Sequence, residues 1–424
     1  MKPRFALVLF LMTLVLAVSC STTNRMTNEI AIDSNLTLEE KLDTLGYESV
    51  SITYPTVIYD GEEWKEQLIQ MLKDTKDYFI CTVFLGSECD ENQEIFDIMR
   101  SKAQEGVDIY VVTDGTSSLD MTDSKYHLRT LYDLREYGVH LLEYNPLTVK
   151  KLAWGFNLFF REHRKYFVSD GLHVAIGGMN LNYISTSSVE NGGDRDSMYI
   201  FDSYSCAKAL TEAFTNFWNR YSWETIEEGS LTAPYEGVEE VGTIKAWIED
   251  QVNGGEIAPL YGSLLAEAKE EVLILPFLPT LNSDMYKALK NCTSRGVKVE
   301  MILRNEDRKS LLNAAKYATK DLIDAGIEVR HEDLDKYTNG SRLHEKLVII
   351  DERYIICGSS NFNFRSMAIS SEVTLVIDCP ELAKQVKEHY LEIRDYTEEI
   401  TYEEAEQWHS LSNKLCFLLN LFGG

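Results

Sequence analysis

The chain has 424 residues, of which 44% are hydrophobic and 26% are charged. This composition is typical of a soluble globular protein with room for two domains, and it excludes a disordered chain, a collagen and a polytopic membrane protein. Lys and Arg number 41 against 68 Asp and Glu, which gives a formal net charge of -27. Such a charge argues against a large basic surface that follows the phosphates of a nucleic acid, so we expect no nucleic-acid partner.

The first predicted element is a targeting segment. An apolar run over residues 5–18 follows Lys2 and Arg4, and it is shorter than the roughly 20 residues that span a bilayer. The string LAVSC, which ends at Cys20, resembles a bacterial lipoprotein signal, in which the cysteine becomes the lipid-modified N-terminus. We therefore expect a signal peptide over 1–19, a lipid anchor at Cys20, and an exported protein held at a bacterial membrane. A plain cleaved signal is the alternative.

Beyond this segment, residues 20–50 are polar and acidic and are expected to form a tether. The chain then repeats itself. DTKDYFICTVFL (74–85) matches EAKEEVLILPFL (267–278), and EGVDIYVVTDG (105–115) matches RGVKVEMILRN (295–305). Each pair has the pattern of a helix end that is followed by an apolar strand.

These repeats predict an α/β protein made of two similar halves that are related by a pseudo-two-fold axis. The expected boundaries are 51–225 for the first half, 226–243 for a linker rich in Gly and Glu, and 244–400 for the second half. Residues 401–424 are expected to be an amphipathic tail that either docks on the core or lies on a membrane. The apolar residues that fit one helical face of this tail are Leu411, Leu415, Leu418, Leu419 and Phe422.

Each half also contains the motif H-x-K-x-x-x-x-D, followed at the same spacing by Gly and Asn. The motif residues are His163, Lys165, Asp170 and Asn180 in the first half, and His344, Lys346, Asp351 and Asn361 in the second half. In a strand, a His and a Lys that are two residues apart project from the same face. A two-fold axis would then bring two imidazoles and two ammonium groups to one place.

Such a set of groups suits attack on a phosphodiester. The reaction needs a nucleophile on one side of phosphorus, a proton source for the leaving oxygen, and cationic donors on the free oxygens. Two His supply the first two, and two Lys, helped by Asn180, Asn361 and Ser359, would hold the oxygens. Because two ammonium groups neutralise the charge and no cluster has a metal-ligand spacing, we expect neither a metal nor another cofactor.

These motifs resemble those of the phospholipase D superfamily, with its duplicated HKD motif, and in particular its cardiolipin synthase branch. REHRKYFVSDG, GGMN and RDSMYIFD are similar to that branch's first motif and the acidic residue beyond it, and LHEKLVIIDERYIICGSSNFNFRSMAISSEV is similar to the second. The resemblance covers about residues 51–400. It implies two phospholipase D-like halves, each a mixed β-sheet flanked by helices. It also implies phosphatidyl transfer through a phosphohistidine, on a phosphatidylglycerol-like phospholipid, to water or an alcohol.

Carried over to this chain, the resemblance implies roles for individual residues. The catalytic motif residues would be His163, Lys165, Asp170, His344, Lys346 and Asp351. The two His would be nucleophile and acid, with His163 expected to attack, and the two Lys would bind phosphate. The two Asp are expected to tie a strand end to its neighbours. Asp196 and Glu372 would each accept a hydrogen bond from a ring N–H and so orient an imidazole.

Other interpretations stay open at this point. A nuclease would use the same chemistry, although the charge argues against it, and a non-catalytic scaffold would keep the fold but has no need of both intact motifs. The aromatic segment 153–161 is either a wall for acyl chains or a buried helix, and Tyr183 and Arg365 either contact a headgroup or brace the loops. Apart from Cys20 the cysteines are odd in number and form no CxxC pair, which predicts buried thiols at Cys81, Cys357 and Cys379.

Overall fold

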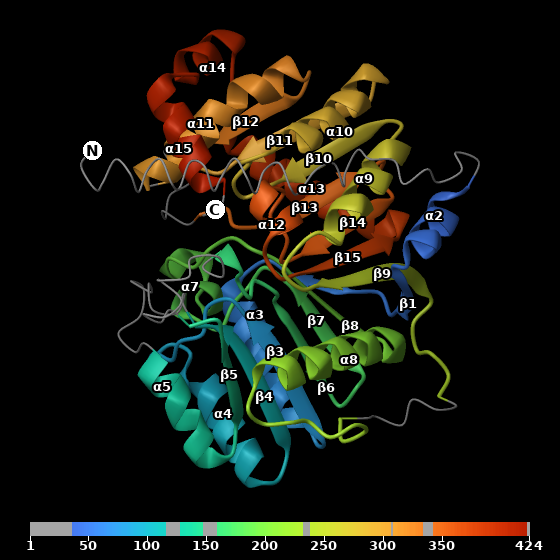
Figure 1. Ribbon diagram of the computed structural model, residues 1–424, viewed down its shortest axis with the longest axis vertical. Helices are drawn as coiled ribbons and strands as arrows, with labels where there is room; N and C mark the ends of the chain where they lie inside the picture. The colour runs from blue at the N-terminus through green and yellow to red at the C-terminus, as the bar shows by residue number, and fades with distance from the viewer. Residues whose placement is uncertain are drawn as a thin grey trace.

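The computed structural model describes residues 36–115, 128–146, 159–231, 238–306, 308–333 and 342–421. The predicted signal peptide and the Cys20 anchor lie outside these ranges, as does most of the aromatic segment 153–161. Within the described ranges, no helix combines the length and the apolar character needed to cross a membrane. The predicted α/β class is confirmed: Figure 1 shows two sheets with their helices, the first half below and the second above.

The first half is a seven-stranded sheet within the described residues, in the order β2-β8-β7-β6-β3-β4-β5. Strands β3, β4 and β5 are parallel, whereas β6, β7 and β8 run antiparallel to their neighbours, so the sheet is mixed. The strands are β2 (Thr56–Ile58), β3 (Tyr78–Val83), β4 (Asp108–Asp114), β5 (His140–Tyr144), β6 (Tyr166–Ser169), β7 (His173–Gly177) and β8 (Met198–Asp202). The helices are α3 (Gly61–Asp74), α4 (Gln93–Gln104), α5 (Leu128–Asp133), η2 (Leu134–Tyr137), α7 (Tyr183–Thr186), η4 (Val189–Asn191) and α8 (Tyr204–Tyr221).

The second half repeats this order inside a nine-stranded sheet of the described chain, β1-β9-β15-β14-β13-β10-β11-β12-β16. The six strands β15-β14-β13-β10-β11-β12 of this sheet correspond, in the same order, to β8-β7-β6-β3-β4-β5 of the first sheet. The strands are β1 (Glu48–Ile52), β9 (Ile244–Gln251), β10 (Glu271–Leu275), β11 (Lys298–Leu303), β12 (Glu328–Glu332), β13 (Leu347–Ile350), β14 (Tyr354–Gly358), β15 (Glu372–Asp378) and β16 (Thr397–Glu399). One helix, α2 (Leu38–Leu45), precedes β1. The other helices are α9 (Ile257–Glu267), α10 (Ser283–Ser294), α11 (Lys309–Asp324), α12 (Phe364–Ala368), α13 (Pro380–Asp395), α14 (Tyr402–Trp408) and α15 (Leu411–Asn420).

The expected tether over 20–50 is wrong for its last part, because α2 and most of β1 are folded there. Thr37 and Glu40 form a capping box at the start of α2, and Leu38 and Leu42 bury one face of this helix against the second half. Strand β1 then pairs antiparallel with β9. Thus the segment that precedes the first half is an edge strand of the second half's sheet (Figure 1).

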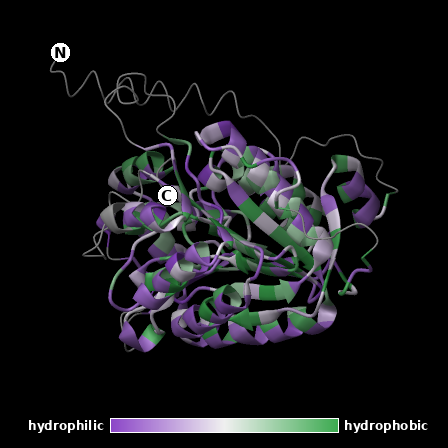
Figure 2. Ribbon diagram, turned by 90° about the horizontal axis from the view of Figure 1, so that it is seen from below, coloured by the Kyte–Doolittle hydropathy of each residue, from purple (hydrophilic) through white to green (hydrophobic). Residues whose placement is uncertain are grey.

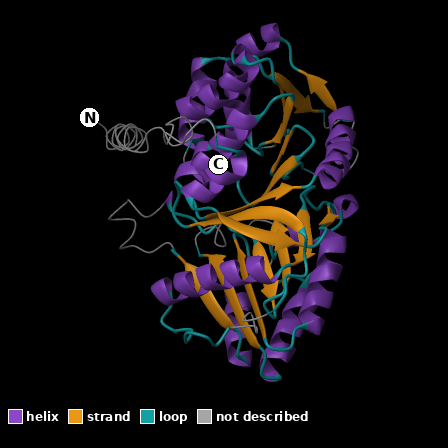
Figure 3. Ribbon diagram, turned by 90° about the vertical axis from the view of Figure 1, so that its right-hand side faces the viewer, coloured by secondary structure: helices purple, strands orange, loops and turns teal. Residues whose placement is uncertain are grey.

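The core consists of strands that are apolar on both faces. All six residues of β3 and all four of β6 and of β13 are buried, as expected where helices cover both sides of a sheet. Figure 3 shows the strands running through the centre with helices on either side, and Figure 2 shows hydrophobic residues on the inner strands. Cys81, Cys357 and Cys379 are buried free thiols, as predicted.

The tail docks on the core, but not through the predicted face. In α15, Phe417 and Leu421 are buried against α11, whereas Leu411, Leu415 and Leu419 are exposed. Leu418 is half-buried, and Phe422 lies outside the described residues. The apolar periodicity of α15 covers nearly its whole circumference, so the sequence did not specify which side faces the protein.

Candidate active site

The two halves are joined by short backbone pairings just before each motif strand. The amide of His163 donates to the carbonyl of Ser371 (3.0 Å), and the amide of Ser371 donates to the carbonyl of Arg161 (2.9 Å). This bridge places His163 three residues before β6, so that it and Lys165 lead into the motif strand and do not lie within it as expected. Ser371 precedes Glu372, the first residue of β15, and His163 is thereby beside Glu372.

The same pairing recurs with the halves exchanged. The amide of His344 donates to the carbonyl of Arg195 (2.7 Å), and the amide of Arg195 donates to the carbonyl of Arg342 (2.8 Å). His344 therefore stands beside Asp196, the residue that follows Arg195. Because Cβ direction is fixed by strand geometry, each bridge directs an imidazole of one half toward a carboxylate of the other.

The carboxylates are bonded to the imidazoles in this crossed arrangement. Nδ1 of His163 lies 2.9 and 3.0 Å from the two carboxylate oxygens of Glu372, and Nδ1 of His344 lies 2.5 Å from Oδ2 of Asp196. A carboxylate on Nδ1 holds the proton there and leaves Nε2 as the free ring nitrogen. The acidic residue after each motif thus orients the histidine of the other motif.

The two lysines are buried in the same cluster. Nζ of Lys165 donates to the carbonyl of His163 (2.6 Å). Nζ of Lys346 donates to the carbonyl of His344 and to Asp196 Oδ2 (3.3 Å), and it lies 2.7 Å from His344 Nδ1. Burial lowers the pKa of Lys165 to about 7, and the charge of Lys346 acts in the same direction. The charge of Lys346 thus reaches Lys165 across the boundary between the halves.

The surroundings of both imidazoles favour the neutral ring. Burial is the main reason that the pKa of His163 falls to about 4, with Lys165 and Arg365 acting in the same direction and Glu372 opposing them. Burial also lowers the pKa of His344 well below its ordinary value, and Lys346, Arg304, Lys165 and His163 add to the effect. The charges that act on His344 include those of Lys165 and His163 of the other half, as expected if the two motifs share one cluster.

Two phenylalanines that the sequence analysis did not single out cover the imidazoles. The ring centroid of Phe84 is 4.8 Å from that of His163, and the centroid of Phe277 is 4.8 Å from that of His344, both in edge-on geometry. The same rings lie 5.4 Å from Nζ of Lys165 and of Lys346. A signal for them existed, because Phe84 and Phe277 occupy matching positions in the repeated segments 74–85 and 267–278.

The three other residues that were predicted to bind phosphate, Asn180, Asn361 and Ser359, differ in their hydrogen bonds. Oδ1 of Asn180 accepts hydrogen bonds from the amides of Phe84 and Leu85 (3.0 Å each), so only its amide NH2 can face a substrate. Oδ1 of Asn361 is buried and has no hydrogen-bond partner among the described residues. The hydroxyl of Ser359 donates to Glu372 (2.5 Å), which means that it supports this carboxylate and does not point to a phosphate.

The two carboxylates are accommodated in different ways. Glu372 also accepts from the hydroxyl of Ser366 (2.6 Å). In the first half, Gly178 stands where the second half has Ser359, and a Cβ at Gly178 would lie 2.0 Å from the carboxylate of Asp196. The shorter aspartate therefore requires glycine at this position, whereas the longer glutamate is held by hydroxyl groups.

The two motif aspartates lie at the far ends of the motif strands and bind backbone. The carboxylate of Asp170 accepts from the amides of Lys76, Asp77 and Tyr78 at 2.8 to 3.0 Å. Asp351 accepts in the same way from the amides of residues 269, 270 and 271. They hold the starts of β3 and β10, as expected for structural members of the motif.

Two buried arginines flank the cluster. Arg365 lies on the His163 side, and burial lowers its pKa to about 10. Arg304 lies over the ring of Phe277, 4.7 Å from its centroid, and bonds to Glu306. Arg304 had no sequence signal, since the matching position of the first half is Asp114. Tyr183 braces a loop, because its hydroxyl donates to the carbonyl of Asn191 (2.8 Å).

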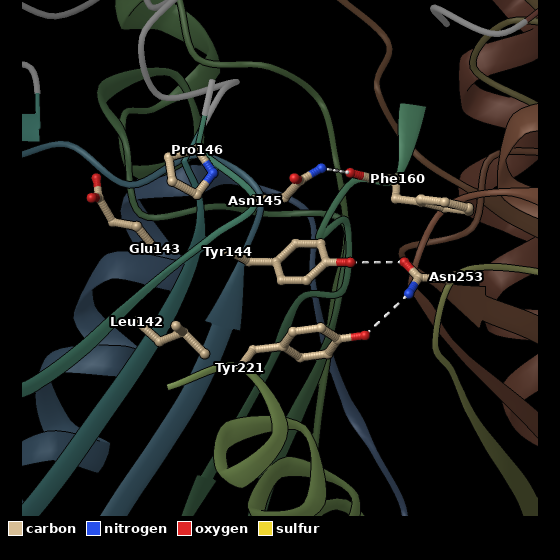
Figure 4. Close-up of a pocket in the computed structure, with 8 residues that line it drawn as sticks. All are labelled: Leu142, Glu143, Tyr144, Asn145, Pro146, Phe160, Tyr221 and Asn253. Carbon is tan, nitrogen blue, oxygen red and sulfur yellow. Dashed lines mark hydrogen bonds between the residues drawn. The ribbon is translucent and has the colours of Figure 1, made fainter. Parts of the chain in front are cut away.

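A separate pocket of about 370 Å³ lies where β5 ends (Figure 4). The hydroxyl of Tyr144 donates to Oδ1 of Asn253 (2.9 Å), and Nδ2 of Asn253 is 3.4 Å from the hydroxyl of Tyr221. Asn145 donates to the carbonyl of Phe160, three residues before His163. No residue of the two motifs lines this pocket. Among the described residues, no group of three or more His, Cys, Asp or Glu is placed to hold a metal ion.

Comparison with known proteins agrees with this geometry. A family model described as "Cardiolipin synthase, PLD-like domain" matches residues 68–218 and 261–394. The chain is 27% identical over 344 residues to a cardiolipin synthase of Alkalihalophilus pseudofirmus, covering 78% of this chain and 64% of that protein. It is 24% identical over 376 residues to a cardiolipin synthase of Halalkalibacterium halodurans, covering 87% of this chain and 72% of that protein.

A solved structure shares the fold across both halves. The phosphatidylserine synthase of Haemophilus influenzae superimposes with a TM-score of 0.71 at 16% identity, over 92% of this chain and all of that one. The chain therefore belongs to the phospholipase D superfamily, in the family of cardiolipin synthase PLD-like domains, and the resemblance seen in its motifs is confirmed.

Proposed function

We propose that the protein is an enzyme that transfers a phosphatidyl group by way of a phosphohistidine. The observation that carries this proposal is the crossed pairing of His163 with Glu372 and of His344 with Asp196, which gathers both imidazoles and both lysines in one buried cluster. The names of the relatives support a phospholipid as the substrate.

In the first step, Nε2 of His163 attacks phosphorus. An N–P bond forms, the P–O bond to the headgroup breaks, and the leaving oxygen takes a proton from His344. His163 suits attack because it is neutral and both carboxylate oxygens of Glu372 fix its ring. His344 must be protonated beforehand, and an anionic phosphate in the cleft raises its pKa toward that state.

In the second step, the oxygen of water or of an alcohol attacks the same phosphorus. The N–P bond breaks, His163 is restored, and His344 takes the acceptor's proton, so that protons balance over the cycle. Lys165 and Lys346 neutralise the phosphate oxygens throughout, and the side-chain amides of Asn180 and Asn361 would assist them. Because these cations supply the charge, the reaction is expected to need no metal ion.

Incubation of the purified protein with phosphatidylglycerol vesicles, with and without EDTA, tests the reaction. We expect cardiolipin or phosphatidic acid by mass spectrometry in both samples, and a loss of at least about a thousandfold in rate for either His163→Asn or His344→Asn. The absence of turnover of any phospholipid by the folded protein would overturn the proposal.

A denaturing quench at neutral to mildly alkaline pH, where the N–P bond survives, assigns the two histidines. The substrate for this test carries a labelled phosphatidyl group and a leaving group that needs no protonation. If His163 is the nucleophile, the label remains on the His344→Asn variant, and the His163→Asn variant traps none. The opposite result would exchange the two roles.

We also propose that the chain is exported and anchored through a lipid on Cys20. The support is the LAVSC string behind a short apolar segment. Metabolic labelling with a radioactive fatty acid should mark the wild-type protein and not Cys20→Ala, and a mature N-terminus elsewhere would contradict the anchor.

A further inference from the structure

The C-terminal helix α15 has apolar residues on two sides, and only one of them is covered. Phe417 and Leu421 are buried against Ala314 and Tyr317 of α11. Leu411, Leu415 and Leu419 are 84%, 45% and 62% exposed and repeat every four residues, which places them on one stripe of the helix. We name these three residues the leucine face.

The charge around the leucine face differs from that of the rest of the chain. The protein carries -27 overall, yet no Asp or Glu occurs between Gln407 and the last residue. Lys414 is an exposed cation on α15. Nδ2 of Asn420 donates to the hydroxyl of Ser310, which brings the exposed Lys309 at the start of α11 beside the end of α15. The neighbouring Arg308 is neutralised by an ion pair with Glu306 (3.1 Å). The leucine face is thus flanked by cations in an otherwise acidic molecule.

The buried side of α15 is continuous with the active site. Phe417 and Leu421 share an apolar cluster with Phe364, the neighbour of Arg365. Phe160, which precedes the first motif, packs on the same cluster. Figure 1 shows α15 beside α11 within the second half, and the two helices pack along each other. α15 therefore packs beside the segment that precedes the first motif and the segment that follows the second motif.

We propose that α15 is an interfacial helix that inserts its leucine face into an anionic phospholipid bilayer and so holds the active site near lipid. The proposal rests on the proposed function, which gives the cleft a substrate that resides in a bilayer. Leucines inserted at the level of the headgroups lose contact with water, and the nearby Lys309 and Lys414 attract the phosphates. The absence of acidic residues on this helix removes the repulsion that the rest of the surface would meet.

Hydrogen exchange on the full chain tests the contact without any need for turnover. Phosphatidylglycerol vesicles should slow amide exchange in peptides from 409–421, while peptides from α13 exchange as before. The N-terminal segment can hold the protein near a vesicle by itself, so the readout is protection of α15 and not overall binding. Unchanged exchange in 409–421 in the presence of bound vesicles would overturn the proposal.

A triple variant separates this contact from catalysis. Leu411→Ser, Leu415→Ser and Leu419→Ser together should abolish the protection and lower turnover of phosphatidylglycerol vesicles by at least about tenfold. Turnover of a soluble short-chain phosphatidylglycerol should stay within a factor of about two, because no substituted residue belongs to the motifs. Leu391→Ser on α13, where the leucine is 44% exposed, is the control and should change neither rate.

The outcomes keep the two proposals apart. If the wild type turns over neither substrate but vesicles protect α15, the proposed function fails and the membrane contact stands. If the triple variant keeps full activity on vesicles, the contact proposal fails. If the wild type is a dimer that the triple variant converts to a monomer, and vesicles do not protect α15, the leucine face binds a second copy of this chain and the proposal is overturned.

Discussion

Glu372 accepts hydrogen bonds from several side chains of the site, namely His163, Ser359 and Ser366. It is fully buried, which raises a carboxyl pKa, yet His163, Lys165 and the hydroxyl of Ser359 outweigh burial and hold its pKa below the ordinary value. If Ser359→Ala removes its hydroxyl, the pKa of Glu372 rises and the carboxylate becomes protonated at a higher pH. We therefore expect the acidic limb of the kcat profile to move to higher pH and the unfolding free energy to fall by about 1–3 kcal/mol.

The neighbouring serine supplies a matched control for this prediction. Ser360 is also buried, and its hydroxyl lies 2.6 Å from that of Thr374, away from Glu372. Ser360→Ala should lose comparable stability and keep the wild-type pH profile. Equal shifts in both variants would mean that the profile reports general loosening and not the protonation of Glu372.

His331 gives a stability prediction that is separate from catalysis. It is buried in β12, and burial with the charge of Lys316 lowers its pKa to about 4. The unfolded chain binds a proton at this residue below pH 6.5 and the folded chain does so only below about 4, so His331 costs stability as pH falls through this window. Between pH 7 and pH 4.5 the unfolding free energy of His331→Gln should therefore fall by up to about 3 kcal/mol less than that of the wild type. Urea unfolding at the two pH values measures this difference.

A second histidine should respond with the opposite sign. The side chain of His173 lies 2.7 Å from Asp202 at the surface, and this hydrogen bond raises the pKa of His173. Its contribution is present below pH 6.5 and is lost as pH rises through the raised pKa. His173→Gln should therefore be less stable than wild type at low pH only. If both variants shifted the pH dependence in the same direction, the assignment of either environment would be wrong.

At the scale of elements, the motif aspartates act on strands. Asp170 has a left-handed backbone (φ 49°) and its carboxylate collects three amides at the start of β3. Asp170→Ala loses these charge-assisted bonds and strains the turn, so the unfolding free energy should fall by about 1–3 kcal/mol. Asp170→Asn keeps one acceptor and tolerates the backbone, so it should lose less.

The kinetic result distinguishes a structural from a catalytic aspartate. Because Asp170 lies at the end of β6 away from His163, the folded fraction of Asp170→Asn should keep its kcat within a few-fold of wild type. Activity per folded molecule, with the folded fraction taken from circular dichroism, is the measurement. A loss of the size expected for His163→Asn would place Asp170 in the chemistry.

Prediction from sequence succeeded where the information is repeated or periodic. The doubled motif specified the histidines and lysines, and the repeated helix and strand segments specified two equivalent halves. The sequence did not show that Glu372 serves His163, because that pairing depends on backbone bridges between segments about 200 residues apart. It likewise did not show β1 pairing with β9, since a lone edge strand has no local signal of its partner.

Arg304 and the tail show two further limits. Arg304 reaches the site because it lies over the ring of Phe277, and the matching position of the first half holds no arginine that would have indicated this role. In α15 the leucines and the phenylalanine surround the helix, so only packing against α11 decides which side is covered. The periodicity of apolar residues favours no single face of α15, and the face that is buried is determined by tertiary packing.

At the scale of the molecule, the halves share one core. A single apolar cluster runs from Tyr166 and Tyr199 of the first half to Leu347 and Leu375 of the second, and it includes the buried faces of α8 and α13. The halves are therefore expected to stay together without the covalent connection between Leu231 and Val238.

A cleavable linker tests this expectation. A protease site inserted between Leu231 and Val238 and then cut should leave one species on gel filtration that keeps most of the activity, because the shared core and the β1–β9 pairing hold the two pieces. Urea should then unfold the cut protein in one transition that coincides with the loss of activity, at a midpoint that falls on dilution. Separation of the pieces in buffer, or two distinct transitions, would show that each half folds alone and that the crossed carboxylates only dock two independent domains.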